Sequence, residues 1–167
     1  MPKEYKRHFI KTKRAKTILK KASEKLNVNL EQIFKSKINM ELIETDFGEI
    51  FLINGKPLMF KRKEEVFPTL IFKEVFDLAP KAIVDMGAIP HVCNGADVMA
   101  PGIVGYKGNF SKGDIVFIVD EKYNKPLAVG EATQNVEDAK TAKHGVIIKN
   151  IHFVGDKIWN LIKNVGG

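Results

Sequence analysis

A succession of short apolar segments separated by turn-forming residues constrains the fold of this chain most. Between residues 38 and 62, the stretches INMELIET, GEIFLI and KPLMFKR have the composition of strands, and Asn54-Gly55 separates the last two. Asn-Gly between apolar runs is the strongest short hairpin signal because both residues tolerate a positive φ. This region is therefore predicted to form a small antiparallel sheet.

The residues after Pro80 predict a second group of short strands. KAIVD, ADVMA and VIIKNIHF have strand composition, GDIVFIVDEKYNKPLAVGEA reads as a hairpin, and GAIPHVCNG favours a short helix. The stretch DIVFIVD is apolar on both pleat faces, so its strand is expected to be covered on both sides. Several short strands with regular turn signals are typical of a small closed barrel.

The stretch DLAP at 77–80 indicates a domain boundary. We therefore predict an α+β protein with a basic amino-terminal α/β domain at 1–79, made of a helix and a small antiparallel sheet, and a β pseudobarrel at 80–167. The preceding stretch PTLIFKEVF is ambiguous, and a helix that begins at Pro68 is slightly favoured, because proline suits the first turn of a helix.

The segment GADVMAPGI at 95–103 contains two glycines and a proline, which a core strand does not require. Gly95 is expected to end the preceding helix in the left-handed conformation. Ala100 to Ile103 fit a type II turn, with Pro101 and Gly102 at its centre. The segment is thus explained by local structure alone. Small residues in an exposed turn also let a nucleic-acid backbone approach the main-chain N–H groups, so both interpretations stay open.

The net charge of +7 is concentrated at one end of the chain. Residues 1–25 hold ten Lys or Arg and two Glu, a charge of +8, whereas the remaining residues carry −1. Apolar residues in this segment follow a helical period, and the cations lie away from that face. The apolar set is Ala15, Ile18, Leu19, Ala22 and Leu26, and the candidate nucleic-acid contacts are Lys11, Lys13, Arg14, Lys16, Lys20, Lys21 and Lys25.

Such asymmetry points to a polyanion partner, either nucleic acid or, less favoured, an anionic membrane. The alternative is the solvated face of a lysine-rich protein. Asn27 is expected to end the helix, and Asn29 to cap a short second one over LEQIF.

The sequence shows no pattern of catalysis or metal binding. The four histidines lack metal-ligand spacing, and no Cys-x-x-Cys, phosphate-binding loop, nucleophile elbow or dinucleotide fingerprint occurs. Cys93, the single cysteine, is expected to be a small buried hydrophobe. No apolar run approaches the ~20 residues that span a bilayer. We expect a cytoplasmic, non-enzymatic protein with no metal, no cofactor and no membrane partner.

The stretch VDMGAIPHVCNGADVMAPGI, followed by GDIVFIVDEKYNKPLAVGEA, resembles a PUA domain, the RNA-binding module named after pseudouridine synthases and archaeosine transglycosylases. The resemblance covers about residues 80–155. It implies a pseudobarrel that binds structured RNA through the helix and loop between Gly87 and Ile103. The contacts it implies are Gly87, Ala88, Gly95, Ala96, Val98, Met99, Ala100, Pro101, Gly102 and Ile103.

A wider resemblance runs from about residue 40 to 163. IFLINGKPLMFKRKEEVFPTL, VDMGAI and NIHFVGDKIWNL are similar in order to the malignant-T-cell-amplified-sequence family and its fungal translation-machinery-associated relatives. That family implies action on the small ribosomal subunit with tRNA, alongside density-regulated protein. The basic amino-terminal helix departs from the family pattern and is typical of an archaeal version.

Three functions follow as hypotheses. The first is a non-enzymatic RNA-binding protein of the translation apparatus that binds tRNA or small-subunit rRNA in initiation or ribosome recycling, with a density-regulated-protein-like factor as a further partner. The second is an RNA-modification factor, or an accessory subunit, that uses the PUA domain to deliver RNA. The third is an interaction adaptor that offers PTLIFKEVF as an apolar surface.

Overall fold

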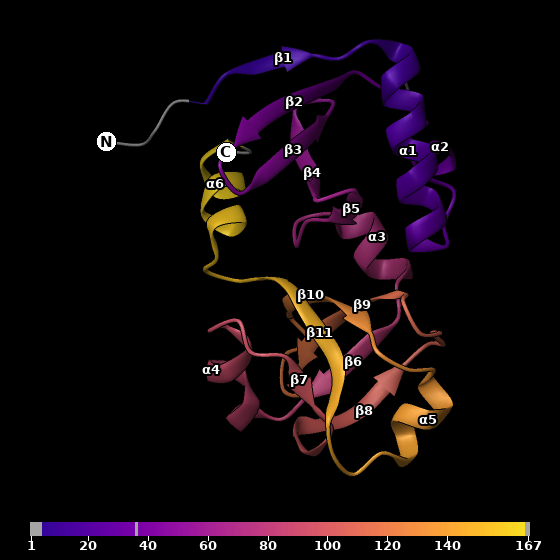
Figure 1. The fold of residues 1–167 in the computed structure, drawn as a ribbon, viewed down its shortest axis with the longest axis vertical. Helices are drawn as coiled ribbons and strands as arrows, with labels where there is room; N and C mark the ends of the chain where they lie inside the picture. The colour runs from indigo at the N-terminus through magenta and orange to yellow at the C-terminus, as the bar shows by residue number, and fades with distance from the viewer. Residues whose placement is uncertain (1–4, 36, 166–167) are drawn as a thin grey trace.

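The computed structural model describes residues 5–35 and 37–165. Figure 1 shows two lobes, each built on its own sheet. The first sheet is antiparallel, with its strands side by side in chain order. These strands are β1 (Arg7–Phe9), β2 (Met40–Thr45), β3 (Gly48–Ile53), β4 (Lys56–Arg62) and β5 (Glu65–Pro68). The turn between β3 and β4 has φ of 51° at Asn54 and 86° at Gly55, which confirms the predicted hairpin.

Three helices complete the first lobe: α1 (Thr12–Leu26), α2 (Leu30–Ile33) and α3 (Lys73–Leu78). The buried residues of α1 are the five of the predicted apolar face. Asn27 ends α1 in the left-handed conformation, and the Asn29 side chain accepts a hydrogen bond from the Glu31 N–H at the start of α2. Both predicted helix boundaries are confirmed.

The helix predicted to begin at Pro68 is wrong, because Pro68 is the last residue of β5 and α3 begins at Lys73. Proline fits there since β5 lies at the edge of the sheet, where a missing N–H costs no ladder bond. Thr69 then holds the chain against β4, since its N–H donates to the Leu58 carbonyl and its hydroxyl to that of Pro57. Most of PTLIFKEVF is buried, so it does not present the adaptor surface hypothesised from the sequence.

The second sheet has six strands in the order β7 (Val98–Met99), β11 (Val146–Phe153), β10 (Pro126–Ala132), β9 (Ile115–Asp120), β6 (Lys81–Val84) and β8 (Ile103–Lys107). The three-residue 3₁₀ turn η2 (Ala100–Gly102) joins β7 at one edge to β8 at the other. A link this short requires the two edges to approach each other, so the sheet curls into the predicted pseudobarrel. All six residues of β9 are buried, as its pattern predicted.

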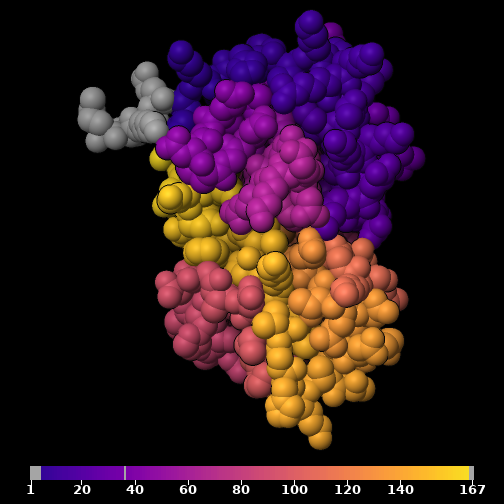
Figure 2. Space-filling model, viewed as in Figure 1, coloured from indigo at the N-terminus to yellow at the C-terminus, as the bar shows by residue number. Residues whose placement is uncertain are grey.

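The barrel's connections include η1 (Met86–Ala88), α4 (Ile89–Val92) and α5 (Val136–Thr141), and α6 (Lys157–Val165) follows β11. Helix α6 packs on the core of the first lobe through Ile158, Leu161 and Ile162. Figure 2 shows the carboxy-terminal segment running along the surface from the second lobe to the first. The same core also takes in Phe117 and Val129 of the second sheet, so the two lobes share apolar packing.

Polar contacts also cross between the lobes. His152, fully buried in β11, accepts a hydrogen bond at Nε2 from the Leu70 N–H, 3.3 Å away. Its ring meets that of Phe60 edge-on, with centroids 5.3 Å apart. The Arg62 guanidinium donates to the Ile151 carbonyl at 2.9 Å. None of the described helices is long and apolar enough to cross a membrane.

Candidate nucleic-acid interface

The segment between β6 and β8 is held by hydrogen bonds from its own polar groups and from β11. Asp85 follows β6, and its Oδ1 accepts a hydrogen bond from the Ala88 N–H at 2.8 Å, which caps η1. The Asp85 N–H donates to the Gly102 carbonyl at 3.0 Å and closes the loop at its base. The Asn150 side-chain amide donates to the carbonyls of Val92 and Ala96, so β11 holds the far end. The loop is therefore preorganised.

The two glycine predictions for this loop had different outcomes. Gly95 has φ of 91° after α4, which confirms the left-handed helix end. The type II turn predicted at residues 100–103 is wrong, because Ala100–Gly102 form the 3₁₀ turn η2, Ile103 begins β8, and Gly102 does not take a positive φ. A tertiary contact holds this turn in place, because the Ala100 N–H donates a hydrogen bond to the Gly145 carbonyl at 3.0 Å.

A pocket of about 450 Å³ opens within this loop. That volume falls within the roughly 300–1,000 Å³ of small-ligand sites. Seven of the ten predicted loop residues line it: Gly87, Ala88, Ala96, Val98, Met99, Pro101 and Gly102. Gly95, Ala100 and Ile103 lie outside its lining, and Val98 is buried beneath it.

Sequence reasoning missed three polar residues of this pocket, namely Asp85, His91 and Asp97. Asp97 also accepts a hydrogen bond from the Asn150 N–H at 2.8 Å. The described lining contains two carboxylates and neither lysine nor arginine. Such a pocket does not suit a phosphate, but it suits the apolar faces and polar edges of a nucleobase or ribose.

The basic helix forms a second, separate surface. Lys11, Lys13, Lys16, Lys20 and Lys21 are exposed along α1 and its amino-terminal flank. Figure 1 places α1 beside the first sheet, whereas α4 and β7 lie in the other lobe. The two predicted groups of RNA-binding residues therefore form two surfaces and not one site.

Two cations of the predicted basic set have structural partners. Arg14 lies 3.5 Å from a Glu49 carboxylate oxygen. Lys25 Nζ lies 3.2 Å from Glu65 in the first lobe and 2.9 Å from Glu131 in the second. Partial burial lowers the pKa of Lys25, but the two carboxylates outweigh burial and raise it above its usual value. Lys25 thus links the lobes and is only partly exposed, unlike the lysines with which the sequence grouped it as a candidate nucleic-acid contact.

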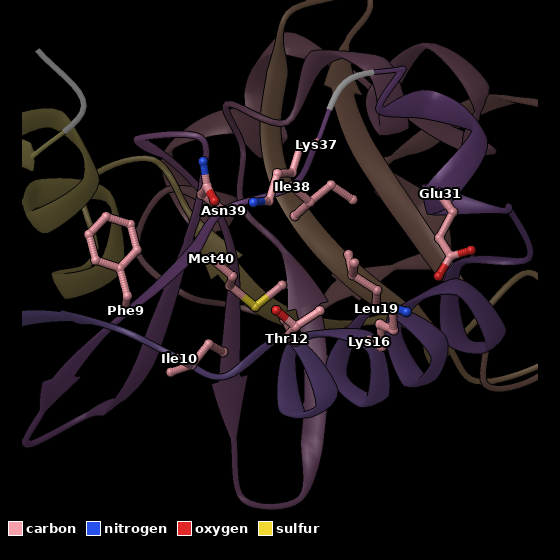
Figure 3. A pocket seen from close by; sticks show the side chains of 11 residues that line it. Phe9, Ile10, Thr12, Lys16, Leu19, Glu31, Lys37, Ile38, Asn39 and Met40 are labelled. Carbon is pink, nitrogen blue, oxygen red and sulfur yellow. The ribbon is translucent and has the colours of Figure 1, made fainter.

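A second pocket, of about 480 Å³, lies between β1, α1 and the segment before β2. Figure 3 shows Ile10, Leu19 and Met40 among its lining, with Lys16 of the basic helix beside Leu19. Of the helix residues that the sequence analysis named, Ala15, Lys16 and Leu19 line this pocket.

Cys93 is only partly buried at the end of α4, so the expectation of a buried hydrophobe is too strong. Burial still raises the pKa of its thiol. Among residues 5–35 and 37–165, no group of three or more His, Cys, Asp or Glu side chains is placed to hold a metal ion.

Known families match both halves of the chain. Residues 80–154 match the PUA domain family, and residues 6–73 match a domain of unknown function, DUF1947. The curled sheet, its loop pocket and the first of these matches define a PUA-domain protein, which supports an RNA-binding role for the second lobe.

Three relatives extend the similarity over most of the chain. An uncharacterized protein of Methanocaldococcus jannaschii is 45% identical, over 93% of this chain and 96% of the relative. Translation machinery-associated protein 20 of Saccharomyces cerevisiae is 32% identical, over 87% of this chain and 84% of the relative. Malignant T-cell-amplified sequence 1 of Rattus norvegicus is 33% identical, over 79% of this chain and 76% of the relative. The chain belongs to the family of these proteins.

Solved structures show the same arrangement. A hypothetical protein from Pyrococcus horikoshii is 36% identical and superposes with a TM-score of 0.79, over 93% of this chain and 99% of that chain. A PUA-domain protein from Aeropyrum pernix is 25% identical, with a TM-score of 0.83, over 98% of this chain and 94% of that chain. The fold is therefore shared across the full length of these proteins.

Proposed function

We propose that this protein is a non-enzymatic RNA-binding protein of the translation apparatus. It binds tRNA or small-subunit rRNA in the cytoplasm during initiation or ribosome recycling, with a density-regulated-protein-like factor as a further partner. The observation that carries the proposal is the pocket between Gly87 and Gly102, which is preorganised, open to solvent and free of lysine and arginine among its described lining residues.

The pocket is suited to an unpaired nucleotide of a structured RNA. Proteins recognise RNA sequence mostly at single-stranded ends and loops, where the bases are free to enter a pocket. Ala88, Met99 and Pro101 offer apolar contact, and the Asp85 and Asp97 carboxylates can accept hydrogen bonds from base or ribose. The phosphate contacts come from elsewhere on the protein.

The exposed lysines of α1 supply those contacts in this proposal. Each lysine that neutralises a phosphate releases a counterion, so binding weakens steeply as salt rises. The names of two relatives, translation machinery-associated protein 20 and malignant T-cell-amplified sequence 1, support the link to translation through their family.

The basic helix is tested by neutralising Lys13, Lys20 and Lys21 with glutamine. Affinity for tRNA and co-sedimentation with small ribosomal subunits are measured across a salt series, and the slope of log affinity against log salt should fall by up to roughly three. The matched control replaces three exposed lysines of the first lobe outside α1, namely Lys56, Lys63 and Lys73, and should keep the slope. Equal slopes in the two variants would exclude α1 as the phosphate-binding surface.

The pocket is tested by Gly102→Val. A Cβ at Gly102 would lie 3.4 Å from the Ala88 Cβ, an ordinary contact, and its φ needs no glycine, so the variant should fold. We expect weaker tRNA binding with an unchanged salt slope, because bulk enters the pocket and no cation is lost. Normal affinity in a folded variant would make the loop purely structural.

The non-enzymatic part of the proposal has its own test. Incubation with bulk tRNA, followed by mass spectrometry of the nucleosides, should leave their composition unchanged. A new modified nucleoside would favour the RNA-modification factor instead.

A further inference from the structure

The turn between β9 and β10 presents an exposed tyrosine between two lysines. Tyr123 is 60% exposed, although tyrosine is intermediate between the mostly buried and the mostly exposed residue types. Lys122 Nζ lies 5.2 Å and Lys125 Nζ lies 5.8 Å from the centre of the Tyr123 ring. An aromatic ring and two lysine cations therefore share one short turn.

Buried Asp120 makes this turn rigid. Its carboxylate accepts hydrogen bonds from the backbone N–H groups of Lys122, Tyr123 and Lys125. The Asn124 N–H donates to the Asp120 carbonyl at 3.0 Å, and Asn124 takes the left-handed conformation, with φ of 55°. Burial alone would raise the pKa of Asp120, but hydrogen bonds from backbone N–H groups, those of Tyr123, Lys125 and Lys122 among them, outweigh it and hold that pKa below its usual value. The backbone beneath the ring is thus fixed at neutral pH.

The turn lies next to the loop pocket. Strands β6 and β9 are parallel, with Val84 opposite Asp120, so their carboxyl ends lie side by side. Glu121 bridges the two segments, because its N–H donates to the Val84 carbonyl at 3.0 Å and its carboxylate accepts from the Met86 N–H at 3.3 Å. Tyr123 is two residues further on, at most about 7 Å of extended chain. Met86 itself is 41% exposed and continues the apolar surface towards Gly87.

An exposed aromatic ring between cations has the chemistry of a nucleobase platform. Every base has a π-face, so stacking on such a ring tolerates any sequence, and nearby lysines contact the flanking phosphates. This complements the loop pocket, whose described lining offers no cation. A strand that places one nucleotide in the pocket would leave its neighbour beside Tyr123.

We propose that Tyr123, Lys122 and Lys125 form a stacking site for an unpaired nucleotide adjacent to the one held by the loop pocket. This inference rests on the proposed RNA-binding function, which it extends from one nucleotide to a short single-stranded segment. The ring supplies the stacking face, and the lysines supply phosphate contacts on either side of it.

The test compares two RNA hairpins of one sequence, with and without a single-stranded 3′ extension. Tyr123→Ala should weaken binding of the extended hairpin by about 5- to 150-fold, the range that loss of one base stack produces, and should leave the blunt hairpin unaffected. Tyr123→Trp should retain the affinity, because it keeps a planar aromatic face. Phe9→Ala removes an aromatic residue that is 70% exposed in the other lobe and is the matched control, which should bind both hairpins normally.

The salt dependence separates stacking from charge. Tyr123→Ala should keep the wild-type slope, whereas Lys122→Gln and Lys125→Gln should each lower it by roughly one. Ultraviolet cross-linking of the extended hairpin should place a cross-linked nucleotide on Tyr123.

The outcomes distinguish this inference from the function on which it rests. Wild-type affinity of Tyr123→Ala for the extended hairpin, or an equal loss on both hairpins, would overturn the stacking site while RNA binding stands. Failure of the wild-type protein to bind either hairpin, tRNA or ribosomal subunits would overturn the proposed function, and the stacking site with it.

Discussion

Replacement of His152 by alanine should uncouple the two lobes. The Nε2 atom accepts the Leu70 N–H, so the imidazole carries its proton on Nδ1, which faces Asp156 Oδ2 at 2.9 Å. Asp156 in turn accepts the Trp159 N–H at 2.7 Å and caps α6. One buried side chain therefore links β11 of the second lobe, the backbone of the first lobe and the helix that closes it.

The cost of His152→Ala can be worked from these contacts. A buried Leu70 N–H left unpaired costs about 1–3 kcal/mol. Loss of the edge-on contact with Phe60 costs about 0.5–1.5 kcal/mol more. The free energy of unfolding should thus fall by roughly 1.5–4.5 kcal/mol, which for a chain of this length corresponds to a decrease in Tm of about 3–18 °C.

Urea unfolding, followed by two probes, measures this effect. Trp159 is the only tryptophan and lies on α6, so its fluorescence reports on the contact of α6 with the first lobe, while far-ultraviolet circular dichroism reports on both sheets. The transitions should coincide in the wild-type protein and separate in the variant. His152→Asn should lose less stability, because its amide keeps an N–H for Asp156. His144→Ala, at an exposed histidine, is the control and should stay within about 0.5 kcal/mol. A His152→Ala variant within about 1 kcal/mol of the wild type, with coincident transitions, would refute the reasoning.

Two further predictions concern stability. Gly130→Ala should lower the free energy of unfolding by about 1–3 kcal/mol in a urea titration, because its Cβ would clash with Ile148 Cγ2 and lie 2.8 Å from the Lys149 carbonyl oxygen; an unchanged midpoint would contradict this. Acid should destabilise the protein through Asp120 and Asp156. Burial would raise the pKa of both, but hydrogen bonds outweigh it and hold both below their usual value. Their contribution is therefore fully present above the unfolded-state pKa of about 3.9 and is lost as pH falls through the folded-state values. Urea midpoints measured down to about pH 2 should fall most steeply below pH 4, and Asp156→Asn should flatten that fall; equal slopes in variant and wild type would exclude Asp156.

Sequence reasoning predicted the local elements well where one physical signal dominated. The five buried residues of α1 follow a helical period, Asn54-Gly55 forms its hairpin, and Gly95 ends its helix with a positive φ. It failed at Pro68 and Gly102, where two local conformations are compatible with the same residues. At both positions, hydrogen bonds to distant segments decide between them.

The candidate site shows the same division. The glycines and small residues of GADVMAPGI marked the loop, and the charge asymmetry marked α1. The places of Asp97, Lys25 and Tyr123 carried no local signal. Asp97 and Lys25 bind residues more than 35 positions away, namely Asn150 for Asp97 and Glu65 and Glu131 for Lys25. The place of Tyr123 depends on the pairing of β6 with β9.

The amino-acid sequence by itself determined most of the helices and strands, the barrel-like second group of strands and the separation of a cationic helix from a small-residue loop. Periodicity and turn residues report the burial and backbone geometry of neighbouring residues, and these are local properties. Only the tertiary structure decided that the lobes are joined through His152 and Lys25, that the loop encloses a pocket free of cations among its described residues, and that Tyr123 lies beside it. These features depend on the register between distant strands, which no local pattern records.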